Sequence, residues 1–173
     1  IHSGCEVDMR EWHDKAAAVI YAWYGGEHTG TVLAEIISGK VSPSGRLPFT
    51  MWGSFENNPC SETYLQDDFL AKKVDRPRFT QCPHVDYKEG VFVGYRAIER
   101  FDRTPLYPFG YGLSYSSFEF SDLSAVPAGD GYDVTFTVKN TGKMKAAQVA
   151  QIYVSPVAPS LPRPVRELKQ FTK

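Results

Sequence analysis

The sequence has no excess of either charge. Its 19 Lys and Arg residues nearly balance its 20 Asp and Glu residues, which leaves a formal net charge of -1 at pH 7. No run of five like charges occurs anywhere in the chain. Proteins that bind nucleic acid or an anionic membrane surface usually carry a basic patch that is visible in the sequence. We therefore expect no nucleic-acid partner.

Long hydrophobic runs are also missing. The longest apolar stretch, residues 16–23, is far shorter than the roughly 20 residues that a membrane-spanning helix needs. The first residues lack the basic and then apolar pattern of a signal peptide. We therefore expect no membrane partner. Because the chain opens with Ile1 rather than Met and closes in a polar run, both ends look cut from a longer protein.

Cysteine is scarce, and its spacing does not indicate a metal centre. The three cysteines are Cys5, Cys60 and Cys82, an odd number without the spacing of metal ligands. The histidines are scattered as well, so we expect no metal and no cofactor. Cys60 and Cys82 flank one polar loop and either pair in an oxidising compartment or remain free thiols.

What the sequence does contain is typical of a globular protein with an α/β beginning. Of its 173 residues, 42% are hydrophobic and 14% aromatic. The apolar run 17–23 predicts a strand buried on both faces of a parallel sheet. A glycine-rich turn, residues 25–30, leads to apolar residues at helical spacing, and Gly39 is placed to end that helix. One parallel strand cannot stand alone, so we expect the rest of the sheet upstream of Ile1.

The second half of the chain changes to strand periodicity. Residues 53–88 have no clear period and predict a long surface excursion, and residues 87–115 are rich in glycine and aromatics and indicate a connector. Apolar residues alternate with polar ones over 132–138, which predicts a strand that ends at the turn 140–142, and a second strand is expected over 148–154. A β-sandwich needs about 100 residues, so this one is expected to be incomplete.

Four segments in this order resemble the C-terminal half of glycoside hydrolase family 3 enzymes of the β-glucosidase or β-xylosidase type. The tail, with Asn140-Thr141-Gly142 and Arg163-Pro164, resembles the fibronectin type III-like domain that these enzymes often append. The ordered set covers nearly the whole chain. The four segments are Trp23-Tyr24-Gly25-Gly26, Pro43-Ser44-Gly45-Arg46-Leu47-Pro48-Phe49-Thr50, Glu89-Gly90-Val91-Phe92-Val93-Gly94-Tyr95-Arg96 and Pro108-Phe109-Gly110-Tyr111-Gly112-Leu113-Ser114-Tyr115.

This resemblance implies a fold class of α/β plus all-β. Residues 1–86 would be the C-terminal part of an α/β sandwich domain with a long loop, 87–117 a connector, and 118–173 the N-terminal half of a fibronectin type III-like domain. The family's barrel with its Asp nucleophile would be missing, and the loop with the acid/base Glu would precede Ile1. The resemblance therefore implies that this chain holds no catalytic residue and is inactive alone.

Three residues are candidates for contact with substrate. Glu27 and His28 follow the predicted strand at the start of the helix, the edge at which open α/β sheets place ligands, although helix capping or a domain-interface hydrogen bond explains them as well. His28 stands where the family commonly has Glu, and Ser42 stands where Asn usually precedes Pro43. Trp52 could stack on a sugar ring, whereas Trp23 is expected in the core.

Two other features have simpler explanations. Gly25 and Gly30 have the spacing of a phosphate-binding loop, but Thr31 occupies the position of its lysine, so close packing explains these glycines better. Glu89 is an acid in the connector. A glycosidase uses two carboxylates roughly 5 to 9.5 Å apart, and the sequence offers Glu89 no such partner, so we expect a structural ion pair, with Arg96 as the partner.

The resemblance implies that the parent protein is a retaining, exo-acting β-glycosidase. It would hydrolyse terminal β-D-glucosyl or β-D-xylosyl residues in carbohydrate catabolism, with an oligosaccharide or glycoside as substrate and with the missing N-terminal barrel of the same chain as partner. The resemblance favours a periplasmic or extracellular location. The alternative is a non-catalytic accessory or interaction module.

Overall fold

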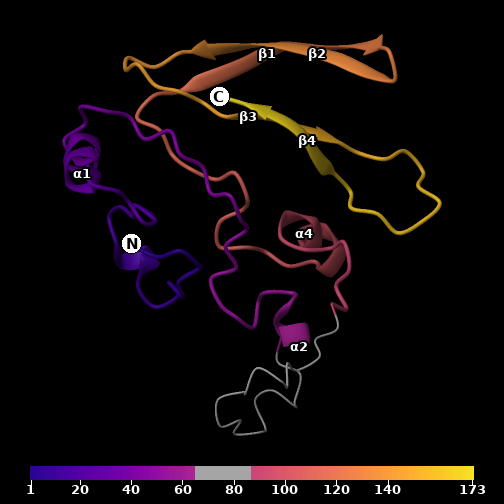
Figure 1. Ribbon diagram of the computed structural model, residues 1–173, viewed down its shortest axis with the longest axis horizontal. Coiled ribbons are helices and arrows are strands. Elements are labelled where there is room, and N and C mark those ends of the chain that lie inside the picture. The colour runs from indigo at the N-terminus through magenta and orange to yellow at the C-terminus, as the bar shows by residue number, and fades with distance from the viewer. Residues whose placement is uncertain (65–86) are drawn as a thin grey trace, which may run out of the picture. The chain divides into compact units, whose positions relative to one another are not determined.

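The computed structural model describes residues 1–64 and 87–173. Its helices are short, and its strands form two separate two-stranded sheets, β1 with β2 and β3 with β4 (Figure 1). None of the described helices is long and apolar enough to cross a membrane. In chain order the elements are the 3-10 helix η1 (His13–Lys15), α1 (Thr29–Ile37), α2 (Ser61–Tyr64), α4 (Tyr95–Phe101), β1 (Phe118–Ala128), β2 (Gly131–Asn140), β3 (Ala150–Val154) and β4 (Glu167–Thr172).

The chain forms two compact units whose segments alternate along the sequence. The first unit contains Ile1–Tyr24, Leu47–Tyr111 and Ile152–Gln170. The second unit contains Gly25–Arg46, Gly112–Gln151 and Phe171–Lys173. Each unit therefore combines segments that are far apart in sequence. The division into 1–86, 87–117 and 118–173 rests on the family resemblance and stays a prediction.

Helix α1, in the second unit, begins and ends where the sequence indicates. At its start the Thr29 hydroxyl donates a hydrogen bond to the Gly26 carbonyl oxygen at 2.6 Å. A Cβ at Gly25 would lie only 1.9 Å from the Thr29 Oγ1, so glycine is needed for this close approach. Gly39 has φ +75°, a left-handed conformation that suits a residue just beyond a helix end. The predicted helix and its end at Gly39 are confirmed.

The strand predicted over residues 17–23 is wrong. The amine of Ile1 donates to the Ile20 carbonyl oxygen at 2.7 Å, and the Ala22 N–H donates to the Ile1 carbonyl oxygen at 2.8 Å. These two bonds do not continue as a ladder, because no described strand lies beside the segment. The apolar run indicates burial between neighbouring strands, and without them Val19 is 37% exposed.

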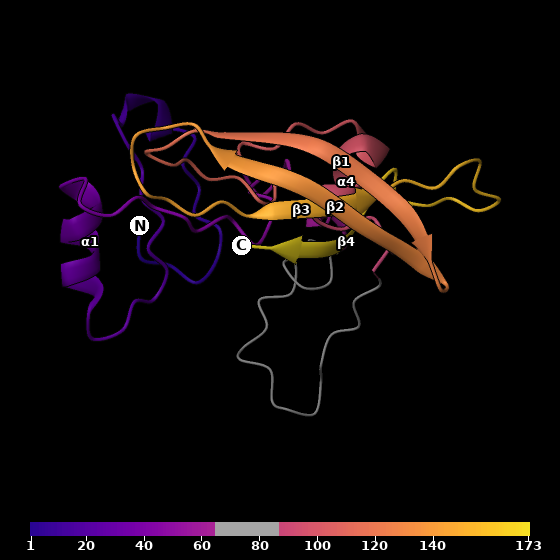
Figure 2. The same cartoon turned by 90° about the horizontal axis from the view of Figure 1, so that it is seen from above.

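Strands β1 and β2 form a long antiparallel hairpin in the second unit. Figure 2 shows them as two curved strands side by side, and their register runs from Phe118 opposite Asn140 to Ala128 opposite Gly131. The strand predicted over 132–138 is confirmed as part of β2. Its predicted half-burial holds only for Val134 and Phe136, since neighbouring apolar side chains are exposed.

The turn that ends β2 is also confirmed. The Asn140 Oδ1 accepts hydrogen bonds from the Gly142 N–H at 3.0 Å and from the Ser116 hydroxyl at 2.6 Å. A Cβ at Gly142 would lie 2.2 Å from the Ser116 Oγ, so the turn packs closely on the segment before β1. The second predicted strand, 148–154, is confirmed as β3, which begins two residues later than expected.

The core of the first unit lies around a short backbone pairing. Met51 and Tyr107 exchange two backbone hydrogen bonds, of 2.8 and 3.1 Å, and form an antiparallel bridge. Met51, Met9 and Ala97 are almost completely buried, at 1%, 1% and 0% exposure. Since these residues come from three distant segments, the core depends on the whole unit.

The connector contains a helix that the sequence did not predict. Helix α4 follows Gly94, whose φ is +54°, and ends at Asp102, whose φ is +48°. The surface excursion predicted over 53–88 is correct only in part. Gly53, Ser61 and Thr63 are buried. Residues 65–86 lie outside the described residues, and because they include Cys82, its pairing with Cys60 stays a prediction.

Candidate functional site

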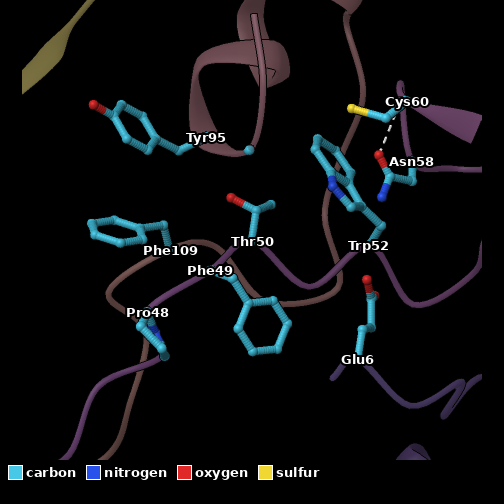
Figure 3. Close-up of a pocket in the computed structure, with 10 residues that line it drawn as sticks. Glu6, Pro48, Phe49, Thr50, Trp52, Asn58, Cys60, Tyr95 and Phe109 are labelled. Carbon is cyan, nitrogen blue, oxygen red and sulfur yellow. Dashed lines mark hydrogen bonds between the residues drawn. The ribbon is translucent and has the colours of Figure 1, made fainter. Parts of the chain in front are cut away.

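A pocket of about 410 Å³ opens in the first unit (Figure 3). It lies against the segment 48–52, with contributions from the N-terminal segment, the residues before α2, the start of α4 and the connector. This volume falls within the range of roughly 300 to 1,000 Å³ that is usual for small-molecule sites. Its lining residues are Glu6, Pro48, Phe49, Thr50, Trp52, Asn58, Cys60, Gly94, Tyr95 and Phe109.

Backbone pairing fixes the two segments that carry most of the aromatic wall. The Leu47 N–H donates to the Tyr111 carbonyl oxygen at 2.8 Å, and the Gly110 N–H donates to the Leu47 carbonyl oxygen at 2.7 Å. Together with the Met51–Tyr107 bridge, these bonds hold residues 47–51 beside 107–111. Phe49 and Phe109 therefore have defined positions at the pocket, although neither segment forms a regular strand.

Glu6 brings a carboxyl group to the pocket. Its Oε1 accepts a hydrogen bond from the Gly53 N–H at 2.7 Å. Burial raises the pKa of Glu6 above its ordinary value of 4.5, and the charge of Asp8 acts in the same direction, while the backbone N–H groups of Gly53 and Trp52 lower it. Burial is the largest cause, so the pKa is raised on balance and Glu6 takes up a proton more readily than an exposed glutamate.

Thr50 presents a polar atom that nothing satisfies. The residue is 4% exposed, and within the part of the chain that the structure describes its Oγ1 has no hydrogen-bond partner. A Cβ added at Gly94, the residue before α4, would lie 3.9 Å from this Oγ1. A buried hydroxyl without a partner costs about 1 to 3 kcal/mol, and such groups call for an explanation.

Trp52 lines the pocket, as a candidate for sugar contact should, but it is 4% exposed and belongs to the core. Its carbonyl oxygen accepts a hydrogen bond from the Asn57 side chain at 3.1 Å, and the same amide group donates to the Thr104 carbonyl oxygen at 3.0 Å. This clamp fixes the backbone next to the indole ring. The sequence placed Trp52 in a loop, and the burial of its ring depends on contacts that no sequence pattern gives.

Trp23 is half-buried. Its ring lies 4.8 Å from that of Tyr21 and 5.6 Å from that of Phe49, measured between centroids. The latter contact supports a wall of the pocket from behind. Trp23 also has φ +54°, an uncommon conformation for a large side chain.

Glu27 and His28 are exposed and do not line the pocket. His28 occupies the N-cap position of α1 but makes no side-chain capping bond. The Thr29 hydroxyl donates to the Gly26 carbonyl oxygen and so does not cap a helix N–H either. The structure therefore brings only Trp52, of the three candidates, to this pocket, and sugar contact by Glu27 or His28 stays a prediction.

Glu89 is buried, at 6% exposure, and the partners that the structure describes for it are neutral. The Thr63 hydroxyl donates to its Oε2 at 2.9 Å, and Glu89 also shares a hydrogen bond with the Cys60 thiol. Burial raises the pKa of Cys60, and the adjacent charge of Glu89 raises it further. The ion pair expected between Glu89 and Arg96 is wrong: no salt bridge joins these two described residues.

Of the ten lining residues, sequence reasoning singled out only Trp52, and Glu6, Thr50 and Tyr95 are among those that it missed. Glu6 has no partner nearby in sequence, because its bond to Gly53 spans 47 positions. Thr50 stands within one of the conspicuous segments, but its burial follows from the pairing with residues 107–111. Within residues 1–64 and 87–173, no group of three or more His, Cys, Asp and Glu side chains could hold a metal ion.

The pocket combines aromatic walls with a carboxyl and a hydroxyl, a composition common in small-molecule sites. Residues 1–95 match the glycosyl hydrolase family 3 C-terminal domain, more than half of the chain, so the chain belongs to glycosyl hydrolase family 3. The resemblance inferred from the motifs is confirmed.

Curated relatives match over the full length of the chain. The protein named "Probable beta-glucosidase I" of Aspergillus flavus is 40% identical over 182 aligned residues, which cover 100% of this chain and 20% of that protein. Its namesake in Aspergillus niger is 39% identical with the same coverage. The chain thus spans about a fifth of the length of these relatives.

Solved structures agree. The GH3 β-glucosidase of Bifidobacterium adolescentis superposes with a TM-score of 0.85 at 35% identity, covering 99% of this chain and 23% of that one. β-Glucosidase 3B of Thermotoga neapolitana, solved in complex with glucose, superposes with a TM-score of 0.84 at 32% identity. The match covers 99% of this chain and 22% of that one. The few helices and small sheets of this chain are consistent with partial domains of such enzymes.

Proposed function

We propose that this chain is a segment of a retaining, exo-acting β-glycosidase that hydrolyses terminal β-D-glucosyl or β-D-xylosyl residues. The observation that carries the proposal is the match, along the whole chain, to proteins named β-glucosidases. The T. neapolitana relative, whose glucose complex is known, supports a glucosyl substrate. In a retaining enzyme one carboxylate attacks the anomeric carbon and a second group protonates the leaving oxygen.

The chain's own part in this function is to bind and position rather than to cleave. Two of its acids, the pocket residue Glu6 and the buried Glu89, both accept hydrogen bonds from the protein itself. The barrel with the nucleophile and the loop with the acid would come from other parts of the polypeptide. Trp52 remains the candidate for contact with sugar, and Glu27 and His28 remain candidates at the start of α1.

The test compares the 173-residue chain with the protein made from the complete reading frame that contains it. We expect hydrolysis of an aryl β-glucoside or β-xyloside by the longer protein and none by the chain alone. Proton NMR of the longer protein's first product should show the β-anomer. Release of the α-anomer would contradict the retaining mechanism, and turnover by the chain alone that is lost in Glu89→Gln would make Glu89 a catalyst.

A further inference from the structure

We propose that the pocket of the first unit binds a small amphiphilic amine, with the ammonium group at the Glu6 carboxylate and the apolar body along an aromatic wall. This wall consists of Phe49, Tyr95 and Phe109. Such binding is independent of the proposed function, because the ligand is a cation rather than a glycoside and no bond is cleaved.

The charge of the pocket is the first support. Glu6 is an acid, and none of the other nine lining residues is Asp, Lys, Arg or His. Within residues 1–64 and 87–173 no ion pair includes Glu6. Its described partners are the neutral backbone N–H groups of Gly53 and Trp52. A cation would supply the missing counter-charge, whereas an anion would be repelled.

The burial of Glu6 selects a cation that can donate hydrogen bonds. The side chain is half-buried, and burial raises its pKa because the charged form loses part of its hydration. A primary ammonium group has three N–H donors, and a carboxylate has lone pairs for several of them. Charge-assisted bonds of this kind are roughly twice as strong as neutral ones. A quaternary ammonium ion has no N–H to donate, so a primary amine fits Glu6 better.

The aromatic wall is the second support. Phe49, Tyr95 and Phe109 are each only half-buried, so their side chains retain surface that a ligand can meet. The Tyr95 and Phe109 rings lie 5.3 Å apart between centroids, which gives the wall a continuous apolar part. An aromatic ring or short alkyl chain would pack on these rings and be removed from water.

The placement of the two features calls for an amphiphile rather than a bare cation. Figure 3 shows Glu6 on one side of the pocket and Tyr95 and Phe109 on the other, with Phe49 between them. The cavity of about 410 Å³ has room for a small molecule that reaches across it. The ammonium group would then lie at Glu6 while the apolar body lies along the wall.

The experiment compares three probes that share one aromatic body and differ in charge. They are phenethylamine, phenethyl alcohol and phenylacetate, titrated at pH 8 into the protein made from the complete reading frame and followed by calorimetry and saturation-transfer NMR. Excess glucose is present throughout, so that a sugar site does not contribute. We expect the ammonium ion to bind roughly 3- to 10-fold more tightly than the alcohol, since its hydrogen bonds to Glu6 are charge-assisted. Phenylacetate should bind most weakly.

Two substitutions separate the role of charge from that of the wall. Glu6→Gln keeps an oxygen that accepts the Gly53 N–H bond but removes the charge, so the preference for the ammonium ion over the alcohol should disappear. Phe109→Leu should weaken both probes alike, by roughly 2- to 10-fold, and leave the preference unchanged. Glu119→Gln, at an exposed acid of β1, is the matched control and should alter neither affinity.

The pH dependence of the wild type gives a test that needs no variant. Protonation removes the charge of Glu6, so the preference for the ammonium ion should be lost as the pH falls through the raised pKa, which lies above 4.5. No preference at pH 8, or the same preference in Glu6→Gln as in the wild type, would overturn the proposal. Equally tight binding of N-acetyl-lysinamide would also overturn it, in favour of a lysine side chain from another protein segment.

Discussion

Tyr95 should stabilise the first unit more than its neighbour Arg96. The Tyr95 hydroxyl accepts a hydrogen bond from the Leu168 N–H at 2.9 Å, which ties the start of α4 to β4. Its ring meets Tyr153 edge-on, with centroids 5.6 Å apart and planes at 82°, and lies 5.3 Å from Phe109. Arg96 contributes a guanidinium 5.8 Å from the same ring.

The magnitudes follow from these contacts. One hydrogen bond contributes about 0.5 to 1.5 kcal/mol, and each aromatic pair adds roughly 0.5 to 1.5 kcal/mol. Tyr95→Leu should therefore lower the free energy of unfolding by about 1.5 to 4.5 kcal/mol. Tyr95→Phe should lose only the hydrogen-bond part. Arg96→Ala should lose about 0.5 to 1 kcal/mol, the value of an exposed cation–π contact.

The assay is urea unfolding of the three variants, followed by intrinsic fluorescence and by far-ultraviolet circular dichroism. Coincident transitions with unchanged slopes would show that the differences are differences in stability. We expect Tyr95→Leu to be the most destabilised of the three variants and Arg96→Ala the least. An Arg96→Ala variant as unstable as Tyr95→Leu would refute the reasoning.

Three further predictions follow from individual contacts. Because the pKa of Glu6 is raised in the folded chain, the folded state holds that proton more tightly, so stability should fall as the pH rises from about 4.5 through the raised pKa, and Glu6→Gln should flatten this part of a melting-temperature profile. Burial and Glu89 raise the pKa of Cys60, so iodoacetamide should label exposed Cys5 faster than Cys60 at pH 8, as read by peptide mass spectrometry; equal rates would contradict this. The exposed Val19, Phe120, Leu123, Tyr132 and Val138 should make the isolated chain bind a hydrophobic dye, whereas a dye-free monomer with a sharp melt would show that these faces need no cover.

Local signals predicted the elements that are stabilised locally. Helix α1 could be predicted because Gly25, Thr29 and Gly39 act within one or two turns of it, and the turn after β2 because Asn140 bonds to its own neighbours. The strand at 17–23 could not form because a buried parallel strand needs hydrogen-bonding neighbours, which the described residues do not provide. Its apolar composition predicted burial in a sheet, but residues 17–23 are exposed or only half-buried, because a pattern cannot supply the partner strands.

The pocket was beyond prediction for a different reason. Glu6 and Gly53, Met51 and Tyr107, and Thr63 and Glu89 are joined across 47, 56 and 26 positions, counted from their residue numbers. None of these pairs has a short-range signature. Trp52 was a candidate on residue type alone, and the structure adds its burial and its neighbours. Tyr95 and Thr50 lay within recognised motifs, yet those motifs did not indicate which of their residues meet in space.

The hydrogen bonds of the half-buried Glu6 and the buried Glu89 bear on what these two acids can do. A general acid must present a proton to the leaving group, and a nucleophile must present a free carboxylate oxygen. Glu89 instead accepts a hydrogen bond from the Thr63 hydroxyl and shares one with the Cys60 thiol. Glu6 accepts a hydrogen bond from the Gly53 N–H, in the backbone just after Trp52. Both acids thus act on backbone and side-chain geometry. Their bonding is in line with the proposal that the nucleophile and the acid come from other parts of the polypeptide.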